Sequence, residues 1–398
     1  MALQAVVTPA PCAAEHDRGT HPLDALLAYE GVYGLSPSAA ADLRLAHLRA
    51  AVVHHRSHNP HFDRYCCGLG FDERTLNSEA DLLRIPLLPT AVFKWQRNKV
   101  RTRTPDDSVL ETSSSGTQGT LSVVPRNDIT LMRFFASVAI GNREVLQVET
   151  FDRHVFNIGP STKQARTLWI AYVMAGVSVI FTTRFYVHDD QFHMHELIAD
   201  LRDLRTSDSI SLVGPPALLL DLANAIEESG ERLRLGPESL VITIGGWKRR
   251  QGDQVDRPAF DARVGSALGI ADVSRIRDTF NMVELNSVVF ECSFRVKHCP
   301  PWVLATARDP RTLTPVPSGE SGILAFLDPT PTSYPGFILS DDFGSVRHGV
   351  ECPCGITGDT LHIERRVNRI ETRGCALKME TLKQPTPLNR VNGLAGHI

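Results

Sequence analysis

The sequence lacks the features of an exported, membrane-spanning or nucleic-acid-binding protein. Its longest apolar run, residues 168–181, is interrupted by Gly176 and Ser178 and is too short to cross a bilayer. No basic region followed by an apolar core opens the chain, which argues against a secretory signal. A formal net charge of −3 gives no reason to expect nucleic acid or an anionic membrane as a partner. We therefore expect a cytoplasmic protein.

The eight cysteines are expected to be reduced thiols, free or bound to a metal, because disulfides are rare in the cytoplasm. Cys66 and Cys67 are adjacent, and we interpret both as structural. A chain of 398 residues with 42% hydrophobic and 22% charged residues is typical of a globular protein of two or three domains.

The spacing of apolar residues predicts an α/β protein. Residues 36–56 have a helical rhythm with Ser38 available as the N-cap. Residues 164–175 suit a helix that ends at Gly176, and residues 177–182 suit a buried strand.

The same alternation continues further along the chain, as helix 193–204, strand 209–213, helix 217–228 and strand 240–244. Strands that alternate with helices at this spacing favour a mainly parallel sheet covered on both faces. After residue 300 short strands punctuated by proline and glycine indicate a smaller β-rich section.

Hydroxyl side chains and two glycines crowd into residues 112–120. Such a loop offers hydroxyl groups and bare backbone N–H groups to a polyphosphate, and glycine allows close approach. It is not a Walker P-loop, because no Gly-Lys-Ser/Thr follows the glycines. Taken alone, the segment is equally well interpreted as a flexible surface loop.

Further segments follow in a fixed order: Gly245-Gly-Trp-Lys248, Phe280-Asn-Met-Val-Glu284, Ile338-Leu-Ser-Asp-Asp342 and ERRVNRIETRG. Together with the hydroxyl-rich loop they resemble the adenylate-forming (AMP-binding) ligases. The segments IPLLPTAVFKW, SYPGFILSDDFG, CPCGITG and IETRGC are similar to one branch, the acyl-protein synthetases of bacterial luciferase operons and the phenylacetate–CoA ligases. The resemblance covers residues 35 to 380.

This resemblance implies a fold and a domain organisation. We expect the large N-terminal domain of an adenylate-forming ligase, with mainly parallel sheets and a smaller β-rich section, followed by a truncated C-terminal domain. Residues 1–34 are expected to form a partly disordered extension, residues 35–363 the AMP-binding domain, and residues 364–398 a short C-terminal remnant.

The activity implied is ATP-dependent conversion of a fatty or aromatic carboxylic acid to an acyl-adenylate, followed by acyl transfer to a thiol. That thiol is Cys375, a partner or acyl-carrier protein, or CoA. One alternative is an acyl- or aryl-CoA ligase of the phenylacetate type. Another is a catalytically degenerate member that serves as a binding or assembly partner of a carrier protein, acyltransferase or reductase.

The resemblance also assigns residues to the nucleotide. The phosphate cradle comprises Ser113, Ser114, Ser115, Gly116, Thr117, Gly119 and Thr120. Related ligases usually carry a lysine near the end of this loop, where Ser122 stands here, so Arg126 or Lys163 would have to supply the positive charge.

Three further segments complete the expected nucleotide site. Glu284 matches the acidic residue that helps hold Mg²⁺, Asp342 matches the ribose-binding aspartate with Asp341 as the near alternative, and the adenine-facing loop comprises Gly245, Gly246 and Trp247. Asn281 and Val283 replace the glycine and threonine usual in these ligases.

The C-terminal segment carries the expected hinge and acceptor. Arg365 and Arg373 fall at the hinge of the family, where an arginine–phosphate contact is apt. Cys375 corresponds to the cysteine that receives the acyl group as a thioester, and Arg373 and Lys378 would favour its thiolate.

A possible structural zinc site is indicated by Cys292 and His298 together with Cys352 and Cys354, a set of soft or borderline ligands on two segments. Cys299 competes with His298 as a ligand. The alternative is a set of reduced, buried cysteines that behave as small apolar residues. The aromatic residues that line an acyl pocket, or simply fill the core, are Phe134, Phe135, Trp169, Tyr172 and Trp247.

Overall fold

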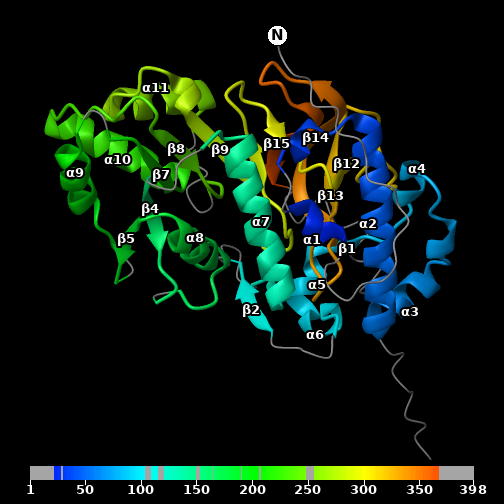
Figure 1. The fold of residues 1–398 in the computed structure, drawn as a ribbon. Helices are drawn as coiled ribbons and strands as arrows, with labels where there is room; N and C mark the ends of the chain where they lie inside the picture. The colour runs from blue at the N-terminus through cyan, green and yellow to red at the C-terminus, as the bar shows by residue number, and fades with distance from the viewer. Residues whose placement is uncertain are drawn as a thin grey trace, which may run out of the picture.

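A computed structural model describes residues 22–27, 30–103, 109–114, 121–148, 153–163, 165–189, 191–205, 208–247 and 255–366 (Figure 1). The helices are α1 Pro22–Leu27, α2 Pro37–His58, α3 Pro60–Gly68, α4 Glu79–Leu82, α5 Thr90–Trp95, α6 Arg97–Val100, α7 Asp128–Glu144, α8 Trp169–Ile180, α9 Met194–Asp203, α10 Pro216–Ser229 and α11 Arg257–Leu268.

The strands of the first half are β1 Leu88–Pro89, β2 Leu110–Ser113, β3 Val123–Arg126, β4 His154–Pro160, β5 Thr183–His188, β6 Gln191–Phe192, β7 Ile210–Gly214 and β8 Leu240–Thr243. Those of the second half are β9 Ile276–Phe280, β10 Val289–Glu291, β11 Lys297–His298, β12 Leu304–Arg308, β13 Ser321–Leu327, β14 Phe337–Glu351 and β15 Thr357–Arg366.

One large mixed sheet contains these strands except β2 and β3, which form a separate pair. Its order is β12-β13-β14-β15-β11-β10-β9-β8-β7-β4-β5-β6, with β1 paired to β14. The part from β5 to β9 is parallel, as the alternation of strands and helices predicted. The β-rich section is antiparallel and continues the same sheet through the pairing of β9 with β10. The α/β fold class is therefore confirmed, with a main sheet that changes from parallel to antiparallel at β9.

Helices pack on this sheet around two apolar clusters. The smaller cluster joins α9, α10 and α11 to β7 and β8 at one side of Figure 1. The larger one includes residues of α2, α7 and the antiparallel strands. Helix α7 approaches β10 closely, because a Cβ atom at Gly141 would lie 2.2 Å from the ring of Phe290. Glycine at this position lets α7 lie against the centre of the sheet.

Two local predictions were wrong in detail. The N-cap of α2 is Ser36, whose hydroxyl accepts from the amide of Ala39, and Ser38 lies inside the helix. Helix α8 begins at Trp169 and runs through Gly176 to Ile180, so neither a helix end at Gly176 nor a strand at residues 177–182 is present. The glycine is required by packing, since a Cβ atom there would lie 1.9 Å from Cε1 of Phe135.

Two pairings bring distant segments to the candidate site. Strand β1 lies parallel to β14, with Leu88 opposite Ile338 and Pro89 opposite Leu339, and it leads directly into α5. Strands β2 and β3 form an antiparallel pair in which Ser113 lies opposite Val123. The hydroxyl-rich segment is therefore the connection of a hairpin.

Candidate active site

The described ends of the hydroxyl-rich loop are fixed by hydrogen bonds within the protein. Ser113 donates its hydroxyl to the carbonyl of Thr167 at 3.1 Å, and the amide of Ser122 donates to Oγ of Ser114 at 3.1 Å. Residues 115–120, which carry the remaining predicted cradle positions Ser115, Gly116, Thr117, Gly119 and Thr120, lie outside the described residues. Ser113 and Ser114 thus hold the base of the loop.

Glu284 is buried at the end of the segment that follows β9, with 5% of its surface exposed. The hydroxyl of Ser122 hydrogen-bonds to it, so the third motif of the sequence lies beside the hydroxyl-rich hairpin. Burial raises the pKa of the Glu284 carboxyl, and the Ser122 hydroxyl and the positive charge of Lys94 oppose this rise in part. A buried carboxylate of this kind favours a cation as its partner.

Lys94 is a site residue that the sequence did not reveal. It lies on α5, and its Nζ atom is 3.1 Å from Oδ2 of Asp341 on β14. Burial raises the pKa values of Glu284 and Asp342, and the charge of Lys94 opposes part of this rise. The available signal was indirect: Lys94 belongs to IPLLPTAVFKW, while the loop lacks its usual lysine.

Asp341 and Asp342 are adjacent on β14 and differ in environment. The Asp341 side chain is 33% exposed and pairs with Lys94. Asp342 is buried, and its Oδ1 atom lies 3.6 Å from Nε of Arg366, its cross-strand neighbour on β15. Burial raises the pKa of Asp342, Arg366 opposes this rise and Asp341 adds to it. The structure brings both aspartates to Lys94, so the choice between them for the ribose stays open.

Arg126, one of the two cations predicted to replace the missing lysine, is committed to the scaffold instead. It is fully buried, donates to Oγ1 of Thr112 and, at 2.6 Å, to the carbonyl of Val283. Its guanidinium lies 3.6 Å from the ring centroid of Trp169. Arg126 is therefore buried within the scaffold, whereas Lys163 is exposed and stays a candidate.

The residues that differ from the family pattern, Asn281 and Val283, both contribute to the protein scaffold. The Asn281 amide accepts from Nε1 of Trp169 at 2.8 Å and donates to the carbonyls of Leu285 and Ser287 at 3.0 and 2.9 Å. Val283 is buried in the larger core. Asn281 therefore fixes the Glu284 segment and anchors Trp169, whose ring also packs on Phe134.

The Gly245-Gly246-Trp247 segment follows β8, next to the end of β9 from which Glu284 comes. Carboxyl ends of neighbouring parallel strands share one edge of a sheet, the usual place for a ligand. Gly245 has a φ of 68°, a left-handed conformation that favours glycine. Trp247 packs edge-on against Phe260 of α11 at 6.2 Å between ring centroids.

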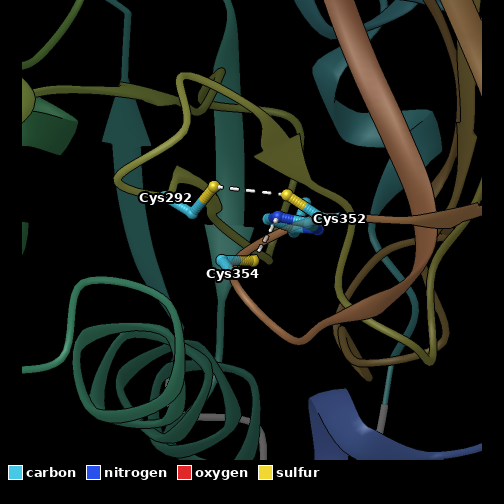
Figure 2. Close-up of side chains that lie close together, drawn as sticks. Cys292, Cys352 and Cys354 are labelled. Atoms are coloured by element: carbon cyan, nitrogen blue, oxygen red, sulfur yellow. Dashed lines mark hydrogen bonds between the residues drawn. The ribbon is translucent and has the colours of Figure 1, made fainter.

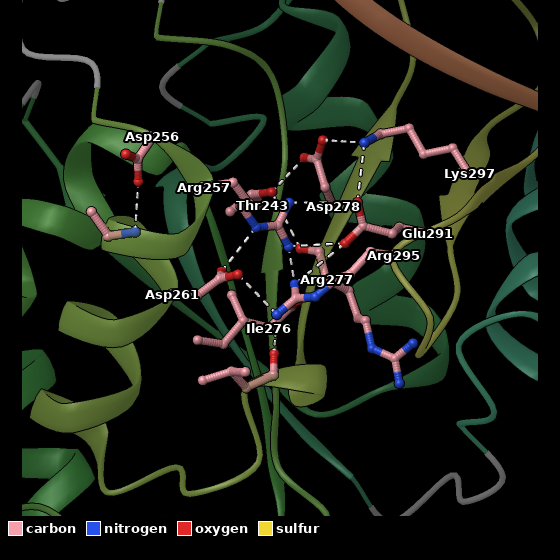
Figure 3. Close-up of polar contacts among 12 residues, drawn as sticks. Thr243, Asp256, Arg257, Asp261, Ile276, Arg277, Asp278, Glu291, Arg295 and Lys297 are labelled. Carbon is pink, nitrogen blue, oxygen red and sulfur yellow. Dashed lines mark hydrogen bonds and ion pairs between the residues drawn. The ribbon is translucent and has the colours of Figure 1, made fainter.

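An ionic network anchors both ends of the segment that contains this loop (Figure 3). Before the loop, Thr243 donates its hydroxyl to Asp278. After it, Arg257 donates to Asp261 at 2.8 Å and to Glu291 at 2.9 Å. Thr243 before the loop is therefore held to β9, and Arg257 after it is held to β10.

The predicted metal ligands Cys292, His298, Cys352 and Cys354 come together, with one ligand atom of each lying within 4.8 Å of the others (Figure 2). The sulfur atoms of Cys292 and Cys352 are 3.8 Å apart, and Sγ of Cys354 is 3.4 Å from Nε2 of His298. Tetrahedral zinc with Zn–S distances of about 2.3 Å separates its sulfur ligands by about 3.8 Å. These residues therefore fit a closed zinc site.

The remaining described cysteines lie outside this cluster. Cys299 is buried elsewhere, so His298 is the member of the adjacent pair that joins the cluster. Burial raises the pKa of the Cys66 thiol to about 12, which makes it an unreactive core residue, while Cys67 is exposed.

Comparison with known proteins identifies the family. The family model described as "Acyl-protein synthetase, LuxE" matches residues 20–383. The chain belongs to the acyl-protein synthetase family. The long-chain-fatty-acid–luciferin-component ligase of Aliivibrio fischeri is 34% identical over 338 residues, 85% of this chain and 88% of the relative. The enzyme of the same name from Vibrio harveyi is 34% identical over 335 residues, 83% of this chain and 86% of the relative.

Solved structures confirm the fold of this acyl-protein synthetase. The 2-hydroxyisobutyryl-CoA ligase in its postadenylation state has a TM-score of 0.67 at 15% identity, over 89% of this chain and 73% of that chain. An open conformation of that ligase gives a TM-score of 0.63 at 16% identity, over 84% of this chain and 71% of that chain. The fold is that of an adenylate-forming ligase.

The family membership makes this chain an enzyme, an ATP-dependent ligase that activates an acid and transfers its acyl group to a thiol. Arg365 is placed on β15, where its guanidinium lies 4.8 Å from the ring centroid of Phe343. Arg373 and Cys375 lie outside the described residues, so their roles stay predictions. Among the described helices, none combines the length and apolar character needed to span a membrane.

Proposed function

We propose that this acyl-protein synthetase activates a long-chain fatty acid as its acyl-adenylate, holds the acyl group as a thioester on Cys375, and passes it to an acceptor protein. The supporting observation is the convergence of Lys94, Glu284, Ser122 and the aspartate pair Asp341 and Asp342 from segments far apart in sequence. The names of the Aliivibrio and Vibrio relatives support the long-chain acid.

In the first step a carboxylate oxygen of the acid attacks the α-phosphorus of ATP, and pyrophosphate leaves. Negative charge on the phosphates must be balanced, and Lys94 is the cation placed beside the site by the β1–β14 pairing. Glu284 is the residue that would hold Mg²⁺, whose charge neutralises phosphate oxygens. Its burial fits this role, because a buried carboxylate without a balancing positive charge is disfavoured.

In the second step the Cys375 thiolate attacks the acyl carbonyl, the acyl–phosphate bond breaks, and AMP leaves with its phosphate charge. Asp342 or Asp341 holds the ribose hydroxyls, and Gly245, Gly246 and Trp247 border the adenine. A thiol of the acceptor protein then takes the acyl group from Cys375, which recovers its proton. This order makes Cys375 dispensable for adenylation and essential for the covalent intermediate.

We further propose that Zn²⁺ bound by Cys292, His298, Cys352 and Cys354 has a structural role. The ligand distances match a tetrahedral centre, and Cys292, His298 and Cys352 are buried. The four protein ligands leave no position for a substrate, which favours a structural centre. The ion would join the segment between β14 and β15 to β11 and the end of β10.

Two measurements on the full chain test the function. ATP–pyrophosphate exchange with tetradecanoic acid should exceed exchange with phenylacetic acid, and intact-mass spectrometry should show one acyl group added. Cys375→Ala should keep exchange and lose the adduct, with Cys67→Ala as the matched cysteine control. Preference for phenylacetic acid, or rapid formation of acyl-CoA without an enzyme adduct, would instead favour a phenylacetate-type ligase. No exchange with any acid would support the alternative that the protein is a catalytically degenerate member of the family.

A further inference from the structure

Strands β9, β10 and β11 carry the ionic network on one face and the metal ligands on the other. On the network face, Nζ of Lys297 lies 2.9 Å from Asp278 and 3.1 Å from Glu291. Cys292 follows Glu291 and His298 follows Lys297, so alternation along a strand sends these ligands to the opposite face. Each metal ligand of this hairpin is thus next in sequence to a charged residue of the network.

The register of β9 and β10 places one more residue on the metal face. Phe290 pairs with Thr279 and Val289 with Phe280. Continuing this register brings Glu291 opposite Asp278, which agrees with their shared partner Lys297. The next step brings Cys292 opposite Arg277, and directly opposed side chains in antiparallel strands lie about 5 Å apart on one face.

Arg277 is a buried cation whose guanidinium is incompletely satisfied. Only 4% of the residue is exposed, and its Nε and Nη1 atoms have no hydrogen-bond partner among the described residues. Arg257 and Arg295, on the network face, both pair with Asp261 and Glu291. Burying a charge without a partner destabilises the folded protein. We therefore expect an anion near Arg277 on the metal face.

The proposed zinc centre is such an anion. Thiolates from Cys292, Cys352 and Cys354 with neutral His298 leave one negative charge on a complex with a divalent ion. Most of this group is buried, so the charge is poorly solvated.

We propose that Arg277, which the strand register places opposite Cys292, supplies the balancing positive charge of the zinc–thiolate centre. This inference rests on the proposed zinc site. Arg277 is a positioning residue that stabilises the metal-bound, ionised form of Cys292 without being a ligand. Groups around metal ligands commonly change metal affinity by about 10- to 100-fold.

Measured Zn²⁺ affinities of two Arg277 variants distinguish the effect of the positive charge from the effect of side-chain shape. Competition of the purified full chain with a chromophoric chelator should show about 10- to 100-fold weaker Zn²⁺ binding in Arg277→Gln, which keeps N–H donors without the charge. Arg277→Lys, which keeps the charge, should restore most of the affinity. Arg275→Gln is the matched control, because Arg275 pairs with Glu238 at 2.8 Å away from the cluster.

The absorption spectrum of the Co²⁺-substituted protein is a second measurement. It should change only if Arg277 acts on the charge of the metal-bound sulfur atoms. In the Co²⁺-loaded protein, the sulfur-to-cobalt charge-transfer band should shift to lower energy in Arg277→Gln and stay near the wild-type position in Arg277→Lys. Equal Zn²⁺ affinity and identical Co²⁺ spectra in all variants would overturn the role of Arg277. Failure of the wild-type protein to bind either ion would overturn the metal site itself.

Discussion

Lys94 and Asp341 form an ion pair, Nζ to Oδ2 at 3.1 Å, although they are separated by 247 positions in the sequence. The pairing of β1 with β14 produces this contact, because it sets α5 beside the strand that carries the aspartates. Lys94 also influences Glu284, the proposed magnesium ligand. The pair therefore links the segment IPLLPTAVFKW to the nucleotide site.

Replacing Lys94 tests whether this cation acts on the phosphates. We expect Lys94→Ala to lower the rate of ATP–pyrophosphate exchange by roughly 100-fold, the order of effect for losing one group that stabilises developing charge. Lys94→Arg should recover part of the rate because it keeps the charge. Lys99→Ala, an exposed lysine on the neighbouring α6, is the control. Wild-type exchange in Lys94→Ala would assign the phosphate cation elsewhere, with Lys163 next.

Glu284 should make the stability of the free enzyme depend on pH. Its pKa is raised above its ordinary value of 4.5, first by burial, so the folded state holds the proton more tightly than the unfolded state. The free energy of unfolding should therefore fall as pH rises from 4.5 through the folded pKa. Glu284→Gln removes this loss, so the variant should be more stable than the wild type, by a margin that increases with pH.

Urea denaturation at pH 5 and pH 8 without ATP or Mg²⁺ measures that margin. The same variant should lose pyrophosphate exchange, since a neutral amide is a poor magnesium ligand. Equal margins at both pH values would show that Glu284 keeps an ordinary pKa when folded.

Local sequence patterns predicted much of the parallel half of the sheet. Strands β7 and β8 and helices α9 and α10 lie close to their expected positions, because each is an apolar run bounded by turn residues. The residues predicted to bind zinc also come together in the fold, and their pairs Cys292/His298 and Cys352/Cys354 are local patterns in the sequence. Lys94 was missed because no local pattern predicts the β1–β14 pairing.

The structural role of Asn281 could not be predicted from the sequence. Asn281 stands where the family usually has glycine, and its amide makes hydrogen bonds to Trp169, Leu285 and Ser287. The hydrogen bond from Trp169 joins residues 112 positions apart and cannot be read from a local motif. Asn281 therefore differs from the family motif because its side chain stabilises the fold of this protein.

Restoring the family glycine should accordingly destabilise this protein. Asn281→Gly leaves the Trp169 N–H and the carbonyls of Leu285 and Ser287 without their partner, at a cost of about 2–4 kcal/mol for several buried groups. Chemical denaturation followed by circular dichroism measures the loss. Improved pyrophosphate exchange with unchanged stability would show instead that Asn281 blocks the nucleotide pocket.

Zinc content provides a direct check on the cysteine cluster. Elemental analysis should find about one zinc per chain in the wild type, as expected for a single closed Cys₃His site. Cys354→Ser should lose the metal and melt at a lower temperature, whereas the matched variant Cys67→Ser should retain both properties because Cys67 is exposed and outside the cluster. Full stability of Cys354→Ser after zinc loss would exclude a structural role for the metal.

Gly176 offers a stability test of the packing between α7 and α8. A Cβ atom there would lie 1.9 Å from Cε1 of Phe135, so Gly176→Ala should destabilise the protein by about 1–3 kcal/mol through overpacking. This cost should exceed the gain from alanine's higher helix propensity, about 1 kcal/mol. In the double variant Gly176→Ala with Phe135→Leu, the smaller side chain should make the alanine nearly neutral relative to Phe135→Leu alone. A stabilised Gly176→Ala single variant would show that α8 and α7 are not in close contact.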